Sequence, residues 1–485
     1  MTASDTEIST PLLIAGQERR TAETFPVYDP AHLGQVVGQA AAATADDALD
    51  AVAAAHQAWP AWAARPAAER AAIAIAALDG LEADADDRTD ILSRENGKIR
   101  GEAAIDQAVF TGRFHQAAEF APELDRPEHI AGPPFSTTIT RLPTGVVTII
   151  YPFNWPLAIL AASLPYALMA GNAVVVKPPP TAPLSSVLTL AQLVRKLPPG
   201  VLNVVTGAAS DIGPVLVGDP RVGHVCFTGG VRGGKQIMKM AASSLTNVTL
   251  ELGGNDPAIV LDDASLDEAA FGRLSGATFM TTGQVCMAIK RLYVPRRRYD
   301  EVIDGLRASL ASSKVGPGLD SATTFGPLNT AQQRDYVTGL TTEAGAAGAE
   351  VLTFGEYTVD AASGNYLLPS LVLDPAPELG IVTEEQFGPA LPVIGYDTEE
   401  EAVALANNTW SGLCSSVWSA DTEHGMAIAG QLRTGVTFFN NHNAAAVDER
   451  APFGGFNSSG IGRELGREGL LEFTQTHAMA VPSEG

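Results

Sequence analysis

The sequence predicts an α/β protein built around a doubly wound parallel sheet, with a second α/β segment after it. Short runs of β-branched residues alternate with helical stretches over residues 144–251, and the same alternation returns over residues 253–447. Parallel strands need long crossover connections, usually helices, so this alternation is what a parallel sheet requires. Ligands of such sheets bind where the strands end at their carboxyl edge.

The individual elements follow from the periodicity of apolar residues. In the first segment we expect strands over residues 146–150, 173–176, 202–205, 224–227 and 247–250, with helices beginning near Pro156, Pro183, Ser210 and Gly230. In the second segment we expect strands over residues 258–261, 291–294, 392–394 and 436–439, and helices over residues 265–281, 299–312, 399–407 and 421–431. Residues 46–119 are Ala-rich and predict helices without obvious chemistry, while the first ten residues predict a loose end.

Composition limits the classes of partner. The 485 residues suffice for two or three domains, and the net charge of −24 argues against nucleic acid or an anionic membrane surface as partner. The apolar run 157–176 is nearly long enough to span a bilayer, but Pro165 and Gly171 interrupt it. A helix followed by the strand 173–176 explains this run better, so we expect no membrane span.

Cysteine usage indicates a reducing compartment. The chain has three cysteines, Cys226, Cys286 and Cys414. Their odd number and wide separation in sequence do not suit a disulfide framework. No basic region followed by an apolar one marks a signal peptide at the N-terminus, so we expect a cytoplasmic protein. No two His or Cys residues fall at ligand spacing, so no metal site is predicted.

The first candidate site pairs a thiol with a carboxylate. Cys286 follows the glycine-flanked bend at Gly283, and Glu251 stands in Leu250-Glu251-Leu252-Gly253-Gly254. A thiol attacks a carbonyl as the thiolate, yet at a pKa of about 8.5 only a few per cent is ionised at neutral pH. The cysteine therefore needs activation, and a carboxylate base that reaches it in space can provide this.

Two further stretches suit a ligand site. The carboxamide of Asn154, held between Pro152 and Pro156 after a predicted strand, is a rigid hydrogen-bond donor for a developing oxyanion. Phe227-Thr228-Gly229-Gly230 follows a strand and opens a helix, where backbone N–H groups can receive a pyrophosphate. This second stretch departs from the G-x-G-x-x-G fingerprint, so alone it is a weak signal.

Six segments occur in an order typical of one family. They are Pro152-Phe153-Asn154-Trp155-Pro156, Lys177-Pro178, Glu251-Leu252-Gly253-Gly254, the segment 279–286 ending at Cys286, Glu384-Glu385-Gln386-Phe387-Gly388-Pro389 and Pro452-Phe453-Gly454-Gly455. Through them the chain resembles the aldehyde dehydrogenase superfamily over nearly its whole length. The resemblance implies an NAD(P)-dependent, non-acylating enzyme that converts a small-molecule aldehyde to the acid.

The resemblance also implies roles for individual residues. Cys286 would form a thiohemiacetal and then a thioester, Asn154 and the Cys286 backbone N–H would hold the oxyanion, and Glu251 would activate water for hydrolysis. The positions implied for the cofactor site are Phe153, Lys177, Pro180, Gly207, Thr228, Gly229, Gly230, Leu252, Gln333, Glu385 and Phe387.

Three positions depart from the family's pattern. Pro180 stands where a Glu often binds the adenosine ribose, which removes a carboxylate that would repel a 2′-phosphate but adds no cation to attract one. Cofactor choice therefore favours NAD only slightly over NADP. Gly230 replaces a common hydroxyl residue, and Phe153 replaces a frequent Trp.

The expected aldehyde pocket is apolar. Trp155, Met280, Met287 and Phe453 are its expected lining, and no Arg or Lys lies within three residues of Cys286. A medium-chain or aromatic aldehyde suits this lining better than a semialdehyde with a carboxylate tail.

Domain organisation is likewise implied by the resemblance. Residues 1–120 and 144–252 would bind the cofactor, residues 253–455 would form the catalytic domain, and residues 121–143 with 456–485 would form a small β element for assembly into a homodimer or homotetramer. Two alternatives remain beside this function: a CoA-acylating aldehyde dehydrogenase, and a catalytically silent structural member of the family. The presence of Glu251 argues against the first, and the presence of both Cys286 and Glu251 argues against the second.

Overall fold

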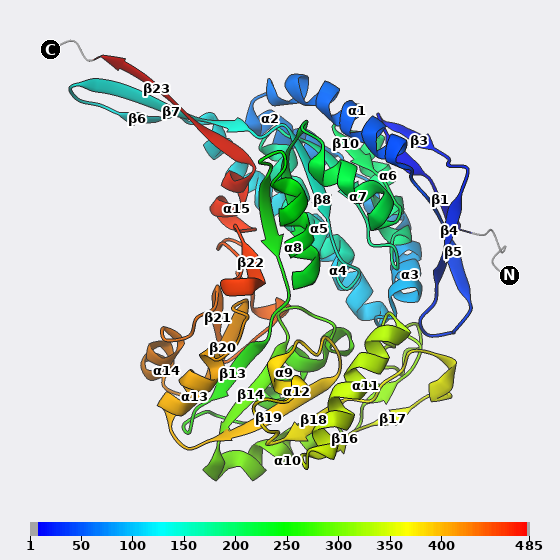
Figure 1. The fold of residues 1–485 in the computed structure, drawn as a ribbon, viewed down its shortest axis with the longest axis vertical. Helices are drawn as coiled ribbons and strands as arrows, with labels where there is room; N and C mark the ends of the chain where they lie inside the picture. The colour runs from blue at the N-terminus through cyan, green and yellow to red at the C-terminus, as the bar shows by residue number, and fades with distance from the viewer. Residues whose placement is uncertain (1–7, 483–485) are drawn as a thin grey trace.

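The computed structural model describes residues 8–482 and has an eight-stranded sheet at its centre (Figure 1). Five neighbouring strands in the order β12-β11-β8-β9-β10 are parallel. They are β8 (Val146–Ile150), β9 (Ala173–Lys177), β10 (Leu202–Val204), β11 (Val222–Thr228) and β12 (Asn247–Glu251). These confirm the five predicted strands. The chain winds outward from β8 to β10 and then returns to lay β11 on the other side of β8, which makes the β8/β11 boundary a topological switch point.

Short antiparallel strands extend this sheet at both edges and were not predicted. They are β22 (Gly460–Ile461) beside β12, and β2 (Leu12–Ile14) with β3 (Gln17–Arg19) beside β10. A separate three-stranded sheet joins β1 (Ile8–Thr10), β4 (Thr24–Tyr28) and β5 (Val36–Ala41). The expectation of a loose N-terminal end is therefore wrong for residues 8–10, which pair with β5. Residues 1–7 lie outside the described part of the chain.

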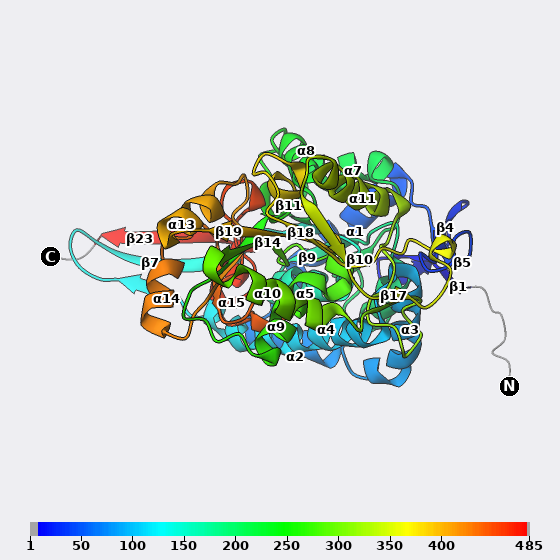
Figure 2. The same ribbon diagram turned by 90° about the horizontal axis from the view of Figure 1, so that it is seen from below.

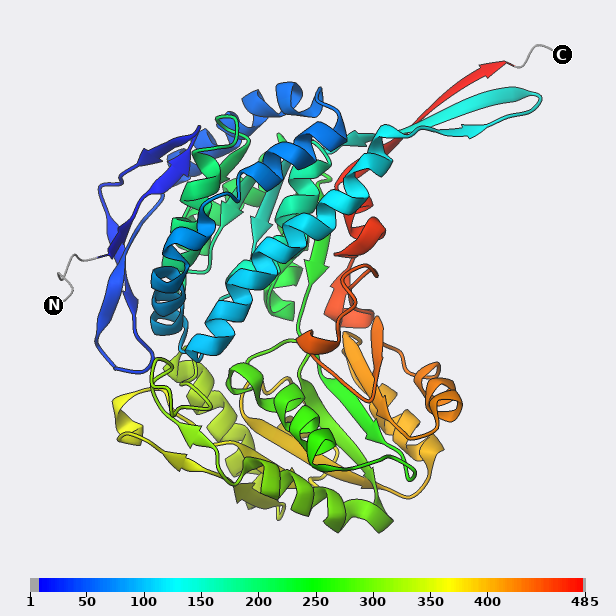
Figure 3. The same cartoon turned by 180° about the vertical axis from the view of Figure 1, so that it is seen from behind.

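Helices cover both faces of the central sheet. Side chains alternate along a strand, so in β9 Val174 and Val176 face one layer while Val175 faces the other. The first layer contains α5 (Pro156–Met169) and α6 (Leu184–Val194), with α2 (Ala67–Ala76), α3 (Ala85–Asn96) and α4 (Arg100–Phe120) outside them (Figure 3). The second layer contains α1 (Ala45–Ala63), α7 (Ala209–Gly218) and α8 (Val231–Ala241).

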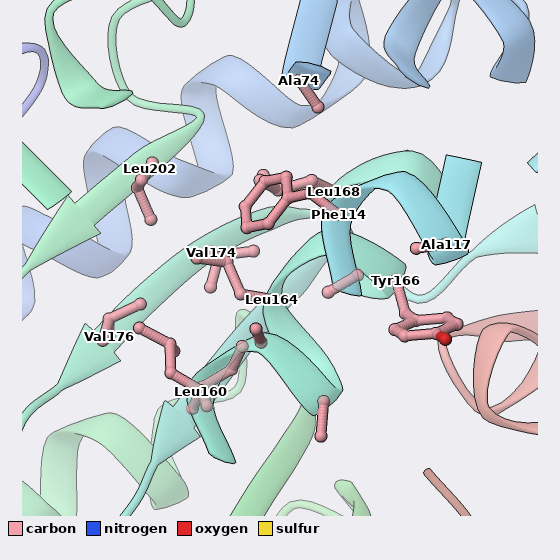
Figure 4. Packing of buried hydrophobic residues seen from close by; sticks show 14 of the residues in the cluster. Ala74, Phe114, Ala117, Leu160, Leu164, Tyr166, Leu168, Val174, Val176 and Leu202 are labelled. Carbon is pink, nitrogen blue, oxygen red and sulfur yellow. The ribbon is translucent and has the colours of Figure 1, made fainter. Parts of the chain in front are cut away.

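The apolar run 157–176 forms a buried helix and a strand. The helix α5 ends at Met169, and β9 follows from Ala173. Figure 4 shows Leu160 and Leu164 of α5 packed near Val174 and Val176 of β9 in the core. Among residues 8–482 we find no helix long and apolar enough to cross a membrane.

The second α/β segment forms a seven-stranded sheet in the order β16-β18-β19-β14-β13-β20-β21. Its strands are β13 (Asp256–Val260), β14 (Ile289–Pro295), β16 (Glu350–Thr353), β18 (Ser370–Leu373), β19 (Ala390–Tyr396), β20 (Cys414–Trp418) and β21 (Val436–Phe439). Its helices are α9 (Glu268–Phe279), α10 (Tyr299–Leu310), α11 (Ala331–Ala346), α12 (Gly380–Thr383), α13 (Glu399–Asn407) and α14 (Thr422–Ala429). All strands but β16 run parallel to their neighbours. The four predicted strands are confirmed, while β16, β18 and β20 were missed.

One predicted helix is too long. We expected a helix over residues 265–281, but α9 ends at Phe279 and a 3-10 turn (Met280–Gly283) follows. Thr281 and Thr282 have left-handed backbone angles, which a right-handed helix cannot include. The apolar periodicity alone gave no sign of this turn.

A three-stranded antiparallel arm projects from the body of the molecule (Figures 1 and 2). It consists of β6 (Glu128–Ile130), β7 (Phe135–Pro143) and β23 (Thr474–Pro482), reached through α15 (Gly466–Glu472). A two-stranded pair, β15 (Lys314–Val315) with β17 (Glu356–Tyr357), completes the strands. Apolar side chains are exposed along the arm, among them Ile130, Phe135, Leu142, Met479 and Val481.

Candidate active site

Two cavities meet at Cys286, and the larger has a volume of about 280 Å³. It lies at the carboxyl ends of β8 and β11, at the switch point of the central sheet. Its lining is Pro152, Phe153, Asn154, Ile159, Thr228, Gly229, Gly230, Glu251, Leu252, Gly253, Cys286, Gln333, Glu385 and Phe387. The structure thus gathers most of the predicted site residues around one cavity, although they are spread over more than 230 positions of sequence.

The smaller cavity, of about 50 Å³, shares a wall with the larger one. Its lining is Arg113, Ile159, Ala162, Thr228, Glu251, Leu252, Cys286, Met287, Val447, Phe453, Glu464 and Leu465. Five residues line both cavities: Ile159, Thr228, Glu251, Leu252 and Cys286. The thiol and the carboxylate therefore belong to the wall between the two cavities, where each is accessible from both sides.

A strained turn presents Cys286. Thr281 (φ 52°) and Thr282 (φ 54°) are β-branched residues in the left-handed region, and Gly283 (φ 73°) continues it. Such a backbone costs about 1–3 kcal/mol for each non-glycine residue and persists only where the surroundings impose it. At Gly283 a side chain is excluded as well, because a Cβ would lie 2.3 Å from the Gly388 carbonyl oxygen.

Hydrogen bonds from three segments impose this turn. The Thr281 N–H donates to Glu102 Oε1 (2.7 Å), and the Thr282 hydroxyl donates to the Gly326 carbonyl (2.8 Å). The buried Gln284 side chain donates to the Thr281 carbonyl (3.2 Å) and accepts from the Asn329 N–H (3.0 Å). The backbone before Cys286 is thereby fixed in one position.

The thiol is protonated in this environment. Burial raises the pKa of Cys286 to about 12, although the nearby Lys290 opposes that shift. The Lys290 ammonium donates to the carbonyls of Val285 (2.6 Å) and Cys286 (3.0 Å). The expectation of surroundings free of basic residues thus missed Lys290, which lies four positions after Cys286 and folds back beneath it. At neutral pH the thiol needs a base.

Glu251 has the properties of such a base. It is buried, and neither carboxylate oxygen has a hydrogen-bond partner among the described residues. Burial raises its pKa well above the ordinary value, and the neighbouring Glu464 raises it further. A carboxyl group with a raised pKa is a stronger base when ionised, and without partners it is available to a proton donor in either cavity.

Asn154 lies where an oxyanion donor is required. Its amide nitrogen donates to the Gln284 carbonyl (2.9 Å), two residues before Cys286. A primary amide carries two N–H donors, so this bond orients the group and leaves a second donor for the cavity that Asn154 lines. The bond also joins the segment after β8 to the segment that carries the nucleophile.

The predicted residues after α12 form one side of the larger cavity. Glu385 accepts from the Gly254 N–H (3.2 Å) and faces Lys290 at 3.7 Å, and burial raises its pKa to about 7. The Phe387 ring meets Phe153 edge to face at 6.2 Å between centroids. Gln333 donates to the carbonyls of Gln386 (2.8 Å) and Phe387 (3.1 Å), so it holds the loop on which Phe387 stands.

The N-terminus of α8 offers backbone donors to the larger cavity, although the N–H of Gly229 before it already donates to the Glu251 carbonyl (3.0 Å). Gly230 is the N-cap of α8, no side chain caps this helix, and a Cβ on Gly230 would meet nothing within 4 Å. Unpaired N–H groups at a helix N-terminus favour phosphate, so this cradle fits a dinucleotide. Lys177, Pro180 and Gly207 do not line the cavity; Lys177 is buried at the end of β9, and burial lowers its pKa to about 8.

The predicted aldehyde-pocket residues divide into two groups. Met287 and Phe453 line the smaller cavity, whereas Trp155 and Met280 reach neither cavity and pack behind Met287 and Ile159. Trp155 turns away because the buried Lys98 ammonium lies 4.0 Å from its ring centroid.

The smaller cavity also holds charged residues that sequence reasoning missed. Arg113 of α4 pairs with Glu449 (2.8 Å) and donates to the Ala158 carbonyl (2.6 Å). Glu464 accepts from the Ser163 hydroxyl (2.8 Å), and burial raises its pKa to about 7. Arg113 lies in the stretch 46–119, where the sequence showed no obvious chemistry, and the structure places it in the lining of this cavity. Glu464 stands between Arg463 and Leu465, and this local sequence gives no sign of a buried carboxylate.

In the part of the chain that the structure describes, no three His, Cys, Asp or Glu side chains gather in a way that could hold a metal ion. The three cysteines are free thiols.

Comparisons with known proteins agree with a thiol beside a dinucleotide cradle. The family model described as "Aldehyde dehydrogenase family" matches residues 17–479. Geranial dehydrogenase from Castellaniella defragrans is 39% identical over 382 residues, which is 78% of each chain.

Two solved structures are similar over nearly the whole chain. A putative aldehyde dehydrogenase from Burkholderia cenocepacia is 33% identical with a TM-score of 0.93, covering 98% of each chain. Betaine aldehyde dehydrogenase from Staphylococcus aureus, solved with NAD+, is 31% identical with a TM-score of 0.92, covering 98% of this chain and 95% of that one. With its thiol, its carboxylate and its glycine cradle around one cavity, the chain belongs to the aldehyde dehydrogenase family and is an NAD(P)-dependent aldehyde dehydrogenase.

Proposed function

We propose that this enzyme oxidises apolar aldehydes, medium-chain or aromatic, to carboxylic acids through a thioester on Cys286 that water hydrolyses. This proposal rests mainly on the observation that Cys286 and Glu251 each line both cavities. One base can then serve a thiol that meets aldehyde from one side and cofactor from the other. In this proposal the smaller cavity takes the aldehyde.

The first step uses Glu251, Cys286 and Asn154. The ionised Glu251 takes the proton of the Cys286 thiol, and the thiolate attacks the carbonyl carbon of the aldehyde. The free N–H of the Asn154 amide and the backbone N–H of Cys286 donate to the oxygen that becomes negative. A bound nicotinamide would supply the acceptor for the hydride of the thiohemiacetal carbon.

The second step uses Glu251 again. Its proton from the first step is released, and the carboxylate then takes a proton from the water that attacks the thioester carbon. The carbon–sulfur bond breaks, the leaving sulfur takes from Glu251 the proton that came from water, and the acid leaves with Cys286 restored as a thiol. A carboxylate without fixed partners suits both proton transfers. This route favours water over coenzyme A as the acyl acceptor.

The cofactor residues are proposed on the same basis. The N-terminus of α8 at Gly230 would receive the diphosphate, with Gly229 beside it as a small residue whose N–H donates to the Glu251 carbonyl. Lys177 and Glu385 would bind the ribose hydroxyls, and Phe387 would lie beside the nicotinamide. Phe153, Pro180, Gly207, Thr228, Leu252 and Gln333 complete the proposed set. We favour NAD slightly, since Pro180 supplies neither a carboxylate nor a cation, and a similar structure was solved with NAD+.

An apolar substrate is supported by the pairing of charges around the smaller cavity. Arg113 already has Glu449 as counter-ion, so it offers little to a carboxylate tail. One relative, 39% identical, is named geranial dehydrogenase, and geranial is an apolar aldehyde. A semialdehyde showing the highest kcat/KM of a panel would overturn this substrate class.

The test measures reduced-cofactor absorbance over a panel of aldehydes with NAD and with NADP, using Cys286→Ala as the blank. We expect turnover in the parent enzyme, highest for decanal- and benzaldehyde-like substrates, and none in the blank. Hydride transfer that survives in Cys286→Ala would exclude the covalent route.

Assembly and location are part of the proposal. Apolar side chains exposed on the arm, such as Phe135 and Val481, support a homodimer or homotetramer. In this proposal the subunits assemble through residues 121–143 and 456–485. Residues 1–120 with 144–252 bind the cofactor, and residues 253–455 carry the thiol. Light scattering would show one subunit mass if this were wrong. Three free cysteines support the cytoplasm, which cell fractionation tests.

A further inference from the structure

An ion cluster with a fully buried pair at its centre lies beside the nucleophile turn, and its third member, Glu102, is partly exposed. Lys98 and Asp106 have no exposed side-chain surface, and their Nζ and Oδ2 atoms are 3.1 Å apart. Glu102 lies between them in sequence and also attracts the Lys98 ammonium. Burying such charges is costly unless each finds a partner, so the cluster calls for a physical reason.

The geometry of α4 explains why a cation is needed there. Glu102 and Asp106 are four residues apart on one helix, so their carboxylates lie on the same face and repel each other. Lys98, just before the helix begins, neutralises that repulsion. Its backbone is itself held, because the Lys98 carbonyl accepts from the Ser93 hydroxyl (2.7 Å) and its N–H donates to Asn96 Oδ1 (3.1 Å).

Each carboxylate holds a different part of the active site. Glu102 accepts from the N–H of Thr281, in the left-handed turn that presents Cys286. Asp106 Oδ1 accepts from the Ala158 N–H (2.6 Å), in the first turn of α5, three residues after Trp155. The helix α5 has no side-chain cap of its own, so Asp106 fills that position from another helix.

The cation also contacts the segment of the oxyanion donor directly. Its Nζ lies 4.0 Å from the ring centroid of Trp155, the residue next to Asn154. One ammonium therefore connects the segment that carries Asn154 with the turn that carries Cys286.

We propose that Lys98 is a positioning residue for the oxidation: it sets the Asn154 amide relative to Cys286 through Asp106 and Glu102, without touching the substrate. The inference rests on the proposed roles of Asn154 and Cys286. A displacement of about 1 Å between reacting groups can cost about a hundredfold in rate, which is the size of effect that such a cluster controls.

The test is a double-mutant cycle between Lys98 and Asn154. We expect Lys98→Met to lower kcat about a hundredfold while the KM for NAD changes less than about twofold, because the glycine cradle is untouched. In the Asn154→Ala background the same substitution should cost less than about threefold, since the amide it positions is gone. Equal costs in both backgrounds, or an unchanged kcat, would overturn the inference.

Controls separate positioning from a loss of folding. Arg100→Met removes a cation two residues away that is half exposed and paired with Asp86 and Asp90, and it should keep the parent kcat. Should Lys98→Met fail to fold, Asp106→Asn keeps an acceptor for the Ala158 N–H while removing the charge that holds Lys98. We expect a tenfold lower kcat from it and the same non-additivity with Asn154→Ala; additivity would again exclude positioning. A parent enzyme that oxidises no aldehyde would instead contradict the proposed function.

Discussion

The two cavities that meet at Cys286 differ in their lining: backbone contributes much of the larger one, and side chains form the smaller one. The larger takes one side from backbone, the glycines at the start of α8 and the ends of β8 and β11, and the other from Glu385 and Phe387 on a loop. Apart from the wall that it shares with the larger cavity, the smaller one is lined by side chains of helices α4 and α5, of Met287 and of the segment 447–465. A backbone site recognises what many substrates share, such as a diphosphate, whereas a side-chain site can change by single substitutions. With the roles proposed for the two cavities, cofactor recognition would rest on the fold and aldehyde selectivity on individual side chains.

The wall between the cavities gives the largest expected effect. We expect Glu251→Gln to slow steady-state turnover by about a thousandfold, because water and thiol both lose their base. Raising the pH supplies thiolate directly, so a burst of one reduced cofactor per site should return while hydrolysis stays slow. Rapid quenching and mass spectrometry of the acyl group on Cys286 measure this. Normal turnover in the variant would remove Glu251 from both steps.

On the side of the larger cavity, a charge at the helix N-terminus should affect cofactor alone. Gly230→Glu places a carboxylate in open space at the start of α8, where it repels a diphosphate. We expect the KM for NAD to rise about thirtyfold with the order of preferred aldehydes unchanged. The neutral variant Gly230→Gln, of the same size, should change it less than about threefold. A changed aldehyde preference would contradict the separation of the two cavities.

On the side of the smaller cavity, a bulkier wall should affect the aldehyde alone. Val447→Phe narrows the smaller cavity, and we expect kcat/KM for decanal to fall about tenfold more than for propanal, with the KM for NAD unchanged. Val447→Ala is the matched variant in the opposite direction. Steady-state kinetics with the two aldehydes measures both. Equal losses for long and short aldehydes would show that the substrate lies elsewhere.

The smallest expected effect concerns Glu464, the carboxylate of the smaller cavity that raises the pKa of Glu251. Glu464 is the second cause of the raised pKa of Glu251, so Glu464→Gln should move the acidic limb of the deacylation rate to lower pH by up to about one unit. Gln keeps an acceptor for Ser163. A pH–rate profile of thioester hydrolysis measures the shift, and an unmoved limb would show that the two carboxylates do not interact.

The same substitution should alter stability with pH. The pKa of Glu464 is raised from 4.5 to about 7 in the folded protein, so the folded state binds the extra proton and its stability falls as pH rises through this window. Glu464→Gln should remove that fall, seen as a higher Tm at pH 8 but not at pH 4. An equal change in Tm at both values would mean that the residue acts through packing.

The contrast between the cavities also separates what sequence could predict from what it could not. Asn154, Gly229 and Glu251 follow predicted strands, and the carboxyl ends of adjacent parallel strands meet at one edge, so their gathering followed from the fold class. Arg113 and Glu464 are 351 positions apart and reach one cavity only through tertiary packing. No local pattern marks such a pair.

Near misses have local physical causes. Lys290 is four residues after Cys286, one position beyond the three neighbouring residues that contain no Arg or Lys. It belongs to β14, which begins at Ile289. Trp155 and Met280 are bulky and apolar as a pocket requires, but both pack in a core cluster. The Trp155 ring also contacts the Lys98 ammonium. Lys98 and Asp106 sit in an Ala-rich helical stretch, where charges normally belong to a solvated face.

The turn at Thr281 and Thr282 implies a trade-off between stability and activity. Asn and Gly adopt left-handed backbone angles at lower cost than a β-branched residue, so replacing either threonine relieves strain that the folded chain now carries. A selection for heat resistance alone would favour such replacements. Replacing Thr282 would also remove the hydroxyl that donates to the Gly326 carbonyl, one of the hydrogen bonds that fix the residues before Cys286, so a variant that gains stability from relieved strain would lose rate.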